Sequence, residues 1–172
     1  MICLVLVSLL LITAYTTAVC VKCKGVPYSI SETFYRLEHK LWFGATMFLT
    51  AGLLMPAILE VTPESYQFTA FLACVGMFLV GAAPNFREGL DGTIHTIGAV
   101  LCALFSQVWV MLMCPWILLA WLAYLVPTAA ITWKNYRKRG DARSAFMMTR
   151  PMFWVEIMAL ATTFMTLFLF AL

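Results

Sequence analysis

The feature that most constrains this chain is a series of long apolar runs separated by short polar connections. The runs cover about residues 2–19, 41–59, 68–83, 93–113, 116–133 and 151–172. A helix of roughly 20 apolar residues crosses the hydrocarbon core of a bilayer, and a segment in lipid must satisfy its backbone hydrogen bonds internally. The sequence therefore predicts an all-α, polytopic integral membrane bundle with six transmembrane helices in one domain, residues 1–172.

The composition supports this fold class. Hydrophobic residues make up 63% of the chain and charged residues 11%, whereas soluble domains average roughly 45–50% and 25%. Eleven Lys and Arg against eight Asp and Glu give a net charge of +3. This small excess gives no reason to expect nucleic acid as a partner, and membrane lipids are the expected partners instead.

The placement of the basic residues predicts an orientation. All the Lys and Arg fall in the connections after the first, third and fifth runs. Short loops rich in these residues mark the cytoplasmic face of a membrane protein. With six spans, both the N-terminus and the C-terminus are then outside. Five or seven spans would divide the basic residues between the two faces.

The first run has the charge pattern of a retained span. No charge precedes Ile2–Val19, and Lys22 and Lys24 follow it. A secretory signal peptide has its positive charges in front of its apolar region. We therefore expect this run to stay in the protein as the first transmembrane helix rather than to be a cleaved leader.

The second span has a start signal of its own. Ser29 and Glu32 have the spacing of a capping box, in which each side chain satisfies a backbone N–H group at the start of a helix. The pattern predicts a helix that continues without a break from Ile30 to Leu59. Pro56 is expected to kink its far end.

Two ionisable residues lie inside the expected spans and mark a candidate ligand-binding site. Such residues are costly in hydrocarbon and usually face the bundle interior or a cavity. The first is His95, which shares a helical face with Ala99, Cys102 and Ser106. The second is Glu156, which shares a helical face with Ala159 and Thr163. Because small residues let helices approach closely in lipid, we expect these faces to meet, with His95 and Glu156 paired or sharing a water.

The chemistry of such a pair is open. It can relay a proton, activate a water or hold a metal with a third ligand, and it can equally be a structural hydrogen bond. His95, Glu156 and Asp91 are the candidate catalytic residues. Asp91, Glu38 and His39 lack any fixed metal-ligand spacing, so neither a metal site nor a cofactor is predicted.

The connection between the fifth and sixth runs is the most polar stretch of the chain. It is expected to form a loop over residues 134–143 that contains Arg137, Lys138 and Arg139. Basic clusters next to transmembrane helices attract anionic lipid headgroups. We therefore expect these three residues to contact anionic lipid at the cytoplasmic face.

One short motif carries a family resemblance. Gly81-Ala-Ala-Pro84, followed by His95 near the start of the next span, resembles uncharacterised bacterial six-helix membrane proteins related to the Frag and DRAM families. The resemblance implies a six-helix bundle in the bacterial inner (cytoplasmic) membrane and says little about chemistry. The ceramidase and progestin-receptor superfamily of membrane hydrolases is a poorer comparison, because its late His-x-x-x-His pair is absent.

Three functional hypotheses follow from these patterns. The favoured one is a non-enzymatic integral membrane protein whose bundle binds a lipid, a small apolar ligand or a partner helix, from another membrane protein or from a second copy. The second is a membrane enzyme that acts on a lipid headgroup at the cytoplasmic face. The third is a small proton-coupled transporter, because Pro56 and Pro127 interrupt corresponding spans of two three-span halves.

Overall fold

The structure, a computed structural model, describes residues 1–31, 41–83 and 91–171. All the regular secondary structure in these residues is helical. Six of its helices are long and apolar enough to cross a membrane by length and composition. The predicted fold class, an all-α bundle with six candidate transmembrane helices, is therefore confirmed.

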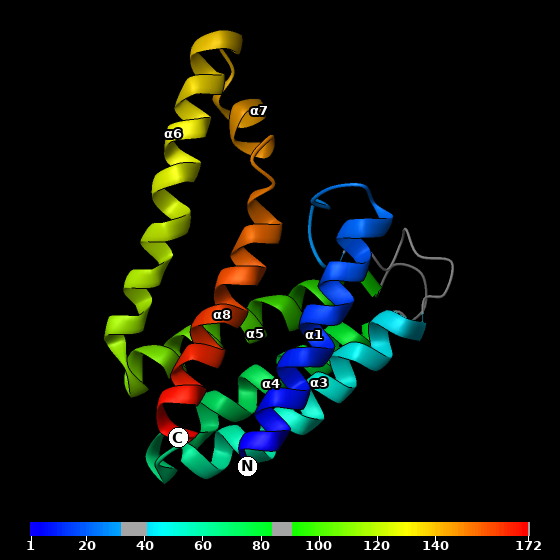
Figure 1. Ribbon diagram of the computed structural model, residues 1–172, viewed down its shortest axis with the longest axis vertical. Coiled ribbons are helices and arrows are strands. Elements are labelled where there is room, and N and C mark those ends of the chain that lie inside the picture. Colours follow the sequence, from blue (N-terminus) through cyan, green and yellow to red (C-terminus); the bar gives the residue numbers. More distant parts are fainter. Residues whose placement is uncertain (32–40, 84–90, 172) are drawn as a thin grey trace.

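The spans expected from the sequence correspond to individual helices or to a pair of consecutive ones (Figure 1). In chain order the elements are α1 (Ile2–Lys22), α3 (Leu41–Val61), the 3-10 helix η1 (Glu64–Tyr66), α4 (Gln67–Ala82), α5 (Asp91–Met113), the 3-10 helix η3 (Pro115–Trp121), α6 (Leu122–Arg139), α7 (Ala142–Met147) and α8 (Pro151–Ala171). The fifth span is made by η3 and α6 together.

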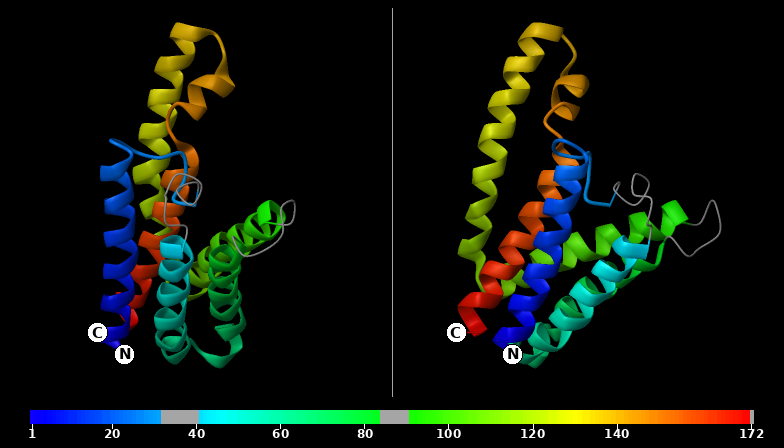
Figure 2. Two further views of the ribbon diagram at one scale, coloured as in Figure 1. Left: turned by 90° about the vertical axis from the view of Figure 1, so that its right-hand side faces the viewer. Right: turned by 45° about the vertical axis from the view of Figure 1, so that its right-hand side comes forward.

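The helices form a packed group from which α6 stands apart. Helices α1 and α8 lie against a group formed by α3, α4 and α5, which run obliquely to them (Figures 1 and 2). Both chain termini lie at the same end of the bundle (Figure 2). An even number of crossings requires this arrangement, whereas the side of the membrane that this end faces stays a prediction.

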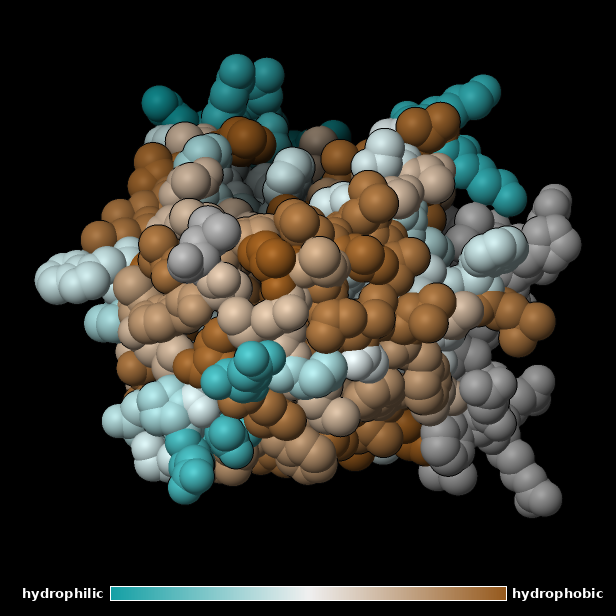
Figure 3. All heavy atoms as spheres, turned by 60° about the horizontal axis from the view of Figure 1, so that its bottom comes forward, coloured by the Kyte–Doolittle hydropathy of each residue, from teal (hydrophilic) through white to brown (hydrophobic). Residues whose placement is uncertain are grey.

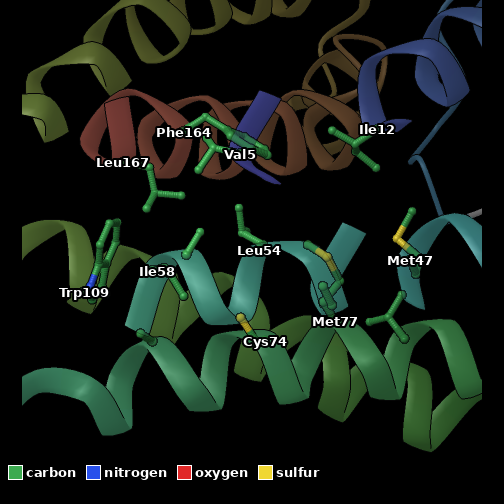
Figure 4. Close-up of a cluster of buried hydrophobic side chains, with 14 of the residues drawn as sticks. Val5, Ile12, Met47, Leu54, Ile58, Cys74, Met77, Trp109, Phe164 and Leu167 are labelled. Atoms are coloured by element: carbon green, nitrogen blue, oxygen red, sulfur yellow. The ribbon is translucent and has the colours of Figure 1, made fainter. Parts of the chain in front are cut away.

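The core lies where α1 and α8 meet the other group of helices (Figure 4). Val5 of α1 and Leu167 of α8 are fully buried and point toward Leu54 of α3. Trp109 of α5 is also fully buried, and its indole nitrogen donates a 2.8 Å hydrogen bond to the hydroxyl of Thr62. The only polar atom of this large side chain is thus satisfied within the core.

Helices α4 and α5 cross with their backbones in contact at two glycines. A Cβ atom added to Gly76 would lie 2.4 Å from the backbone nitrogen of Cys102 and 2.7 Å from the carbonyl oxygen of Gly98. A Cβ on Gly98 would lie 2.8 Å from the carbonyl oxygen of Gly76. No larger residue fits at these distances, so the absence of side chains sets how closely α5 approaches the rest of the bundle.

The structure corrects the expectation that residues 134–143 form a loop. Helix α6 continues through the basic residues to Arg139 and ends at Gly140, whose φ of 75° is left-handed. Asp141 then caps α7 by accepting from the backbone N–H groups of Arg143 and Ser144. Lys and Arg are good helix formers and are favourable at a helix C-terminus, so their charge ended the apolar run without ending the helix.

The expected helix start at Ile30 is also wrong. Ile30 and Ser31 lie in a turn, and the described part of the second span begins at Leu41. The hydroxyl of Ser29 lies 3.1 Å from that of Ser31, and the proposed capping partner Glu32 lies outside the described residues. The backbone N–H group of Ile30 is used by a distant side chain instead, as described below.

The outer surface agrees with a lipid environment. Hydrophobic side chains cover most of the face shown in Figure 3, and hydrophilic ones occupy smaller areas of it. Many large apolar residues are exposed, among them Trp116, Leu125 and Val126 on the fifth span. A soluble protein rarely exposes so extensive an apolar surface.

Candidate functional site: a cavity between five helices

A partly open cavity of about 120 Å³ lies between the packed helices. Its walls are mainly aliphatic, aromatic and sulfur-containing: Ile12 of α1; Phe43, Met47, Leu54 and Ile58 of α3; Ala73, Cys74, Met77 and Val80 of α4; Ala99, Cys102, Ala103 and Ser106 of α5; Glu156, Ala159, Leu160 and Thr163 of α8; and Ile30 and Ser31 between α1 and α3. An engineered apolar cavity of roughly 150 Å³ stays dry and admits benzene. This space is therefore of a size that suits part of an apolar molecule.

The two helical faces singled out in the sequence both line this cavity. From α5 they contribute Cys102 and Ser106, and from α8 they contribute Glu156, Ala159 and Thr163. The two faces therefore border the same space. Their role in binding a ligand stays a prediction.

Glu156 is held at the cavity wall by the segment that follows α1. The backbone N–H group of Ile30 donates to Oε2 of Glu156 at 2.5 Å, and the hydroxyl of Ser31 donates to Oε1 at 3.2 Å. One turn earlier on α8, the backbone N–H group of Phe153 donates to the carbonyl oxygen of Tyr28 at 3.0 Å. These bonds fasten residues 28–31 to the first turns of α8.

His95 lies on the same helix as Cys102 and Ser106. It lies partly buried on α5, but among the described residues the cavity wall on this helix begins one turn further along, at Ala99. The two oxygens of Glu156 accept from Ile30 and Ser31. That His95 also shares a water with this carboxylate stays a prediction.

The roles of the remaining candidates for catalysis or metal binding stay predictions. Helix α5 begins at Asp91, whose side chain lies outside the described residues together with Glu38 and His39. Within the described part of the chain, no group of three or more His, Cys, Asp or Glu side chains is arranged to hold a metal ion. All six cysteines are free.

Sequence reasoning missed Gln107, which joins three elements beside the cavity. Its amide nitrogen donates to the carbonyl oxygen of Ala159 at 3.3 Å and to the hydroxyl of Ser106 at 3.2 Å. Its amide oxygen accepts from the indole of Trp121 at 2.9 Å and from the hydroxyl of Thr162 at 3.0 Å. Gln107 is neutral and so differs from the ionisable residues that marked the candidate site, but an amide in the middle of an apolar run also indicates a polar contact between helices.

The basic residues proposed to contact anionic lipid lie away from the cavity. Arg137, Lys138 and Arg139 are exposed in the last turn of α6, at the end of the molecule opposite the chain termini (Figure 1). The cavity and this basic helix end are therefore two separate features of the fold.

The arrangement as a whole is an apolar space with one carboxyl group in its wall. It can hold an apolar group by exclusion from water and offer hydrogen-bond acceptors at one place. Comparison of the chain with protein-family models, with curated proteins and with solved structures finds no match in any of the three.

Proposed function

We propose that this chain is a non-enzymatic integral membrane protein, in a bacterial inner membrane, whose bundle binds a lipid or another small apolar ligand in the cavity between α1, α3, α4, α5 and α8. One observation carries the proposal, namely that five helices leave about 120 Å³ between largely apolar walls. Native cores keep few voids larger than a water molecule. A space of this size is therefore better explained by an occupant than by packing.

The test is to block the cavity and measure what is lost. Ala99 lies in the cavity wall, and Ala99→Leu would place three more carbon atoms in the space. We expect a lipid or other apolar molecule to co-purify with the wild-type protein at a fixed ratio by mass spectrometry, and Ala99→Leu to reduce that ratio about tenfold, the equivalent of roughly 1.4 kcal/mol of binding energy.

Ala130→Leu is the matched control, because Ala130 is exposed on α6, outside the cavity wall. Equal amounts of co-purified ligand in both variants would show that the molecule sits elsewhere, and would overturn the proposal. A wild-type protein without any bound molecule, in a membrane extract that contains its natural lipids, would do the same.

The two other hypotheses make different predictions, and Glu156 is the residue that supports both. A membrane enzyme would convert a lipid headgroup in a reaction that is lost in Glu156→Gln. A proton-coupled transporter would take up its substrate into vesicles along a pH gradient, again dependent on Glu156. Either result, obtained with a variant that remains folded, would replace the binding hypothesis.

The favoured hypothesis also includes the binding of a partner helix. Such a helix would pack against η3 and α6. Tyr124 is the one residue buried on α6 among those the structure describes, and Trp116, Leu125 and Val126 are exposed on the same span. Crosslinking between cysteines placed at position 126 in two copies would support a homo-oligomer. A monomer in bilayer discs would exclude the second copy as the partner.

A further inference from the structure

The chemistry of the cavity wall also selects the kind of ligand. Among the described residues that line the cavity, Glu156 is the only ionisable residue apart from two cysteines, and the lining contains no Lys, Arg or His. A carboxylate taken out of water is costly unless a cation or several hydrogen bonds compensate it. The described residues of the cavity wall provide hydrogen bonds to this carboxylate, and none of them provides a cation.

The carboxylate keeps capacity for another partner. An ionised carboxylate has about four lone-pair sites. Oε2 accepts from the N–H group of Ile30, and Oε1 accepts from the hydroxyl of Ser31. Further donation from the Ser31 backbone still leaves room for one more donor, such as the N–H groups of an ammonium ion.

The rest of the wall suits a chain of methylene groups. Apolar side chains from four other elements, including Ile12, Phe43, Leu54 and Met77, surround the same space as Glu156. Ser106 and Thr163 bring the other hydroxyls of the lining, and both donate to backbone carbonyl oxygens of their own helices. These hydroxyls therefore do not need a polar group of the ligand.

We propose that the cavity binds an aliphatic amphiphile with a cationic, hydrogen-bond-donating head, a primary amine, with its head at Glu156 and its chain between α3, α4 and α5. This inference rests on the proposed function, because it names the ligand class of the same cavity. An anionic head, such as the carboxylate of a fatty acid, would be placed against the carboxylate of Glu156 and is disfavoured.

The experiment compares three probes of equal chain length, decylamine, decanol and decanoate, on the full-length protein in lipid discs. The measurement is the concentration of each probe that raises the thermal unfolding midpoint by half of its maximal shift. A charge-assisted hydrogen bond contributes enough for a preference of at least about tenfold. We therefore expect decylamine to act at a concentration at least about tenfold lower than decanoate, with decanol between them.

Two variants assign the effect to the cavity. Glu156→Gln retains an acceptor but removes the charge, and we expect it to reduce the preference of amine over acid to within about twofold while decanol still binds. Ala99→Leu should weaken all three probes together. If Glu156→Gln does not fold, the order of the three probes on the wild-type protein decides the question.

Each other outcome contradicts the proposal in a recognisable way. Equal effects of amine and acid, both lost in Ala99→Leu, would overturn the assignment of the head group and leave the cavity as a site for apolar molecules. A preference for the acid would overturn it as well. If no probe acts on the wild-type protein, the proposed function fails and this inference fails with it.

Discussion

Ile30 and Glu156, 126 positions apart in the sequence, are joined by a backbone-to-carboxylate hydrogen bond of 2.5 Å. The bond connects the turn that follows α1 to the second turn of α8, and so joins an N-terminal and a C-terminal segment at the cavity. Ile30 is 5% exposed, so its N–H group has little access to water. A buried backbone donor needs a partner, and here a side chain inside an apolar helix provides it.

The first prediction concerns this bond. Glu156→Ala leaves the buried N–H group of Ile30 without its acceptor, whereas the hydroxyl of Ser31 can turn to Ser29, 3.1 Å away. We expect a loss of about 1–3 kcal/mol in the free energy of unfolding, measured by thermal or denaturant unfolding in detergent. Glu156→Gln should lose less stability, because its amide oxygen still accepts the hydrogen bond.

The exposed Glu60 provides the control. A loss of stability in Glu60→Ala as large as in Glu156→Ala would contradict the structural role of Glu156.

The second prediction concerns Gln107. Gln107→Leu keeps the size of the side chain but removes the acceptor of the Trp121 indole, and we expect a loss of roughly 1–2 kcal/mol in stability, the scale found for polar contacts between helices in lipid. Thr162 should be affected less, because its hydroxyl also lies 2.9 Å from the carbonyl oxygen of Met158.

A double-mutant cycle isolates this contact. The combined variant Gln107→Leu with Trp121→Phe no longer contains the unsatisfied indole N–H group, so it should be more stable than the sum of the two single losses predicts. Strictly additive losses would show that the hydrogen bond between Gln107 and Trp121 does not stabilise the bundle.

The third prediction tests the crossing of α4 and α5. In Gly76→Ala the new methyl group would meet the backbone of Cys102 at 2.4 Å, and backbone atoms cannot move aside as a flexible side chain does. Overpacking of this kind costs about 1–3 kcal/mol or more, and we expect the unfolding midpoint to fall accordingly. The shift of α5 should also change the cavity, because Cys102 lines it.

Gly52→Ala is the matched control for this substitution. Gly52 lies inside α3 with no atom within 4 Å of an added Cβ, so the same change should stabilise the helix by up to about 1 kcal/mol through its helix propensity. Opposite signs at the two glycines are expected. A neutral result at Gly76 would mean that the two helices are further apart than the structure places them.

The sequence predicted the helices well, because the length of an apolar run is dictated by the bilayer and is visible without knowledge of tertiary structure. It also indicated that the faces containing Ser106 and Thr163 are turned inward, where both border the cavity, since small and polar residues in lipid favour the bundle interior. It failed at Arg139 because hydropathy indicates where the apolar run ends and not where the helix ends. It failed at Ile30 because a local spacing motif does not reveal long-range contacts: the hydroxyl of Ser29 lies against that of Ser31, and the N–H group of Ile30 donates to Glu156.

The partner of Glu156 was not predictable for a different physical reason. Sequence patterns compare side chains with side chains, so a carboxylate suggested an imidazole, His95, as its partner. The groups that meet it are a backbone N–H and a hydroxyl from the connection after α1, and every non-proline residue has such an N–H group. Only the path of that connection across α8 reveals which one is used.

The last prediction tests the orientation of the bundle. The test uses a chain whose six native cysteines are replaced by alanine. In this background Lys138→Cys places a thiol among the exposed basic residues at the end of α6. Ser65→Cys places a thiol at an exposed position of η1, in a connection without Lys or Arg. Basic loops stay on the cytoplasmic side, so a membrane-impermeant maleimide should label position 65 on intact cells and position 138 only after permeabilisation. Equal labelling of both after permeabilisation is the control for access. The reverse pattern on intact cells would place both termini inside and would move the carboxylate of Glu156 toward the outer face.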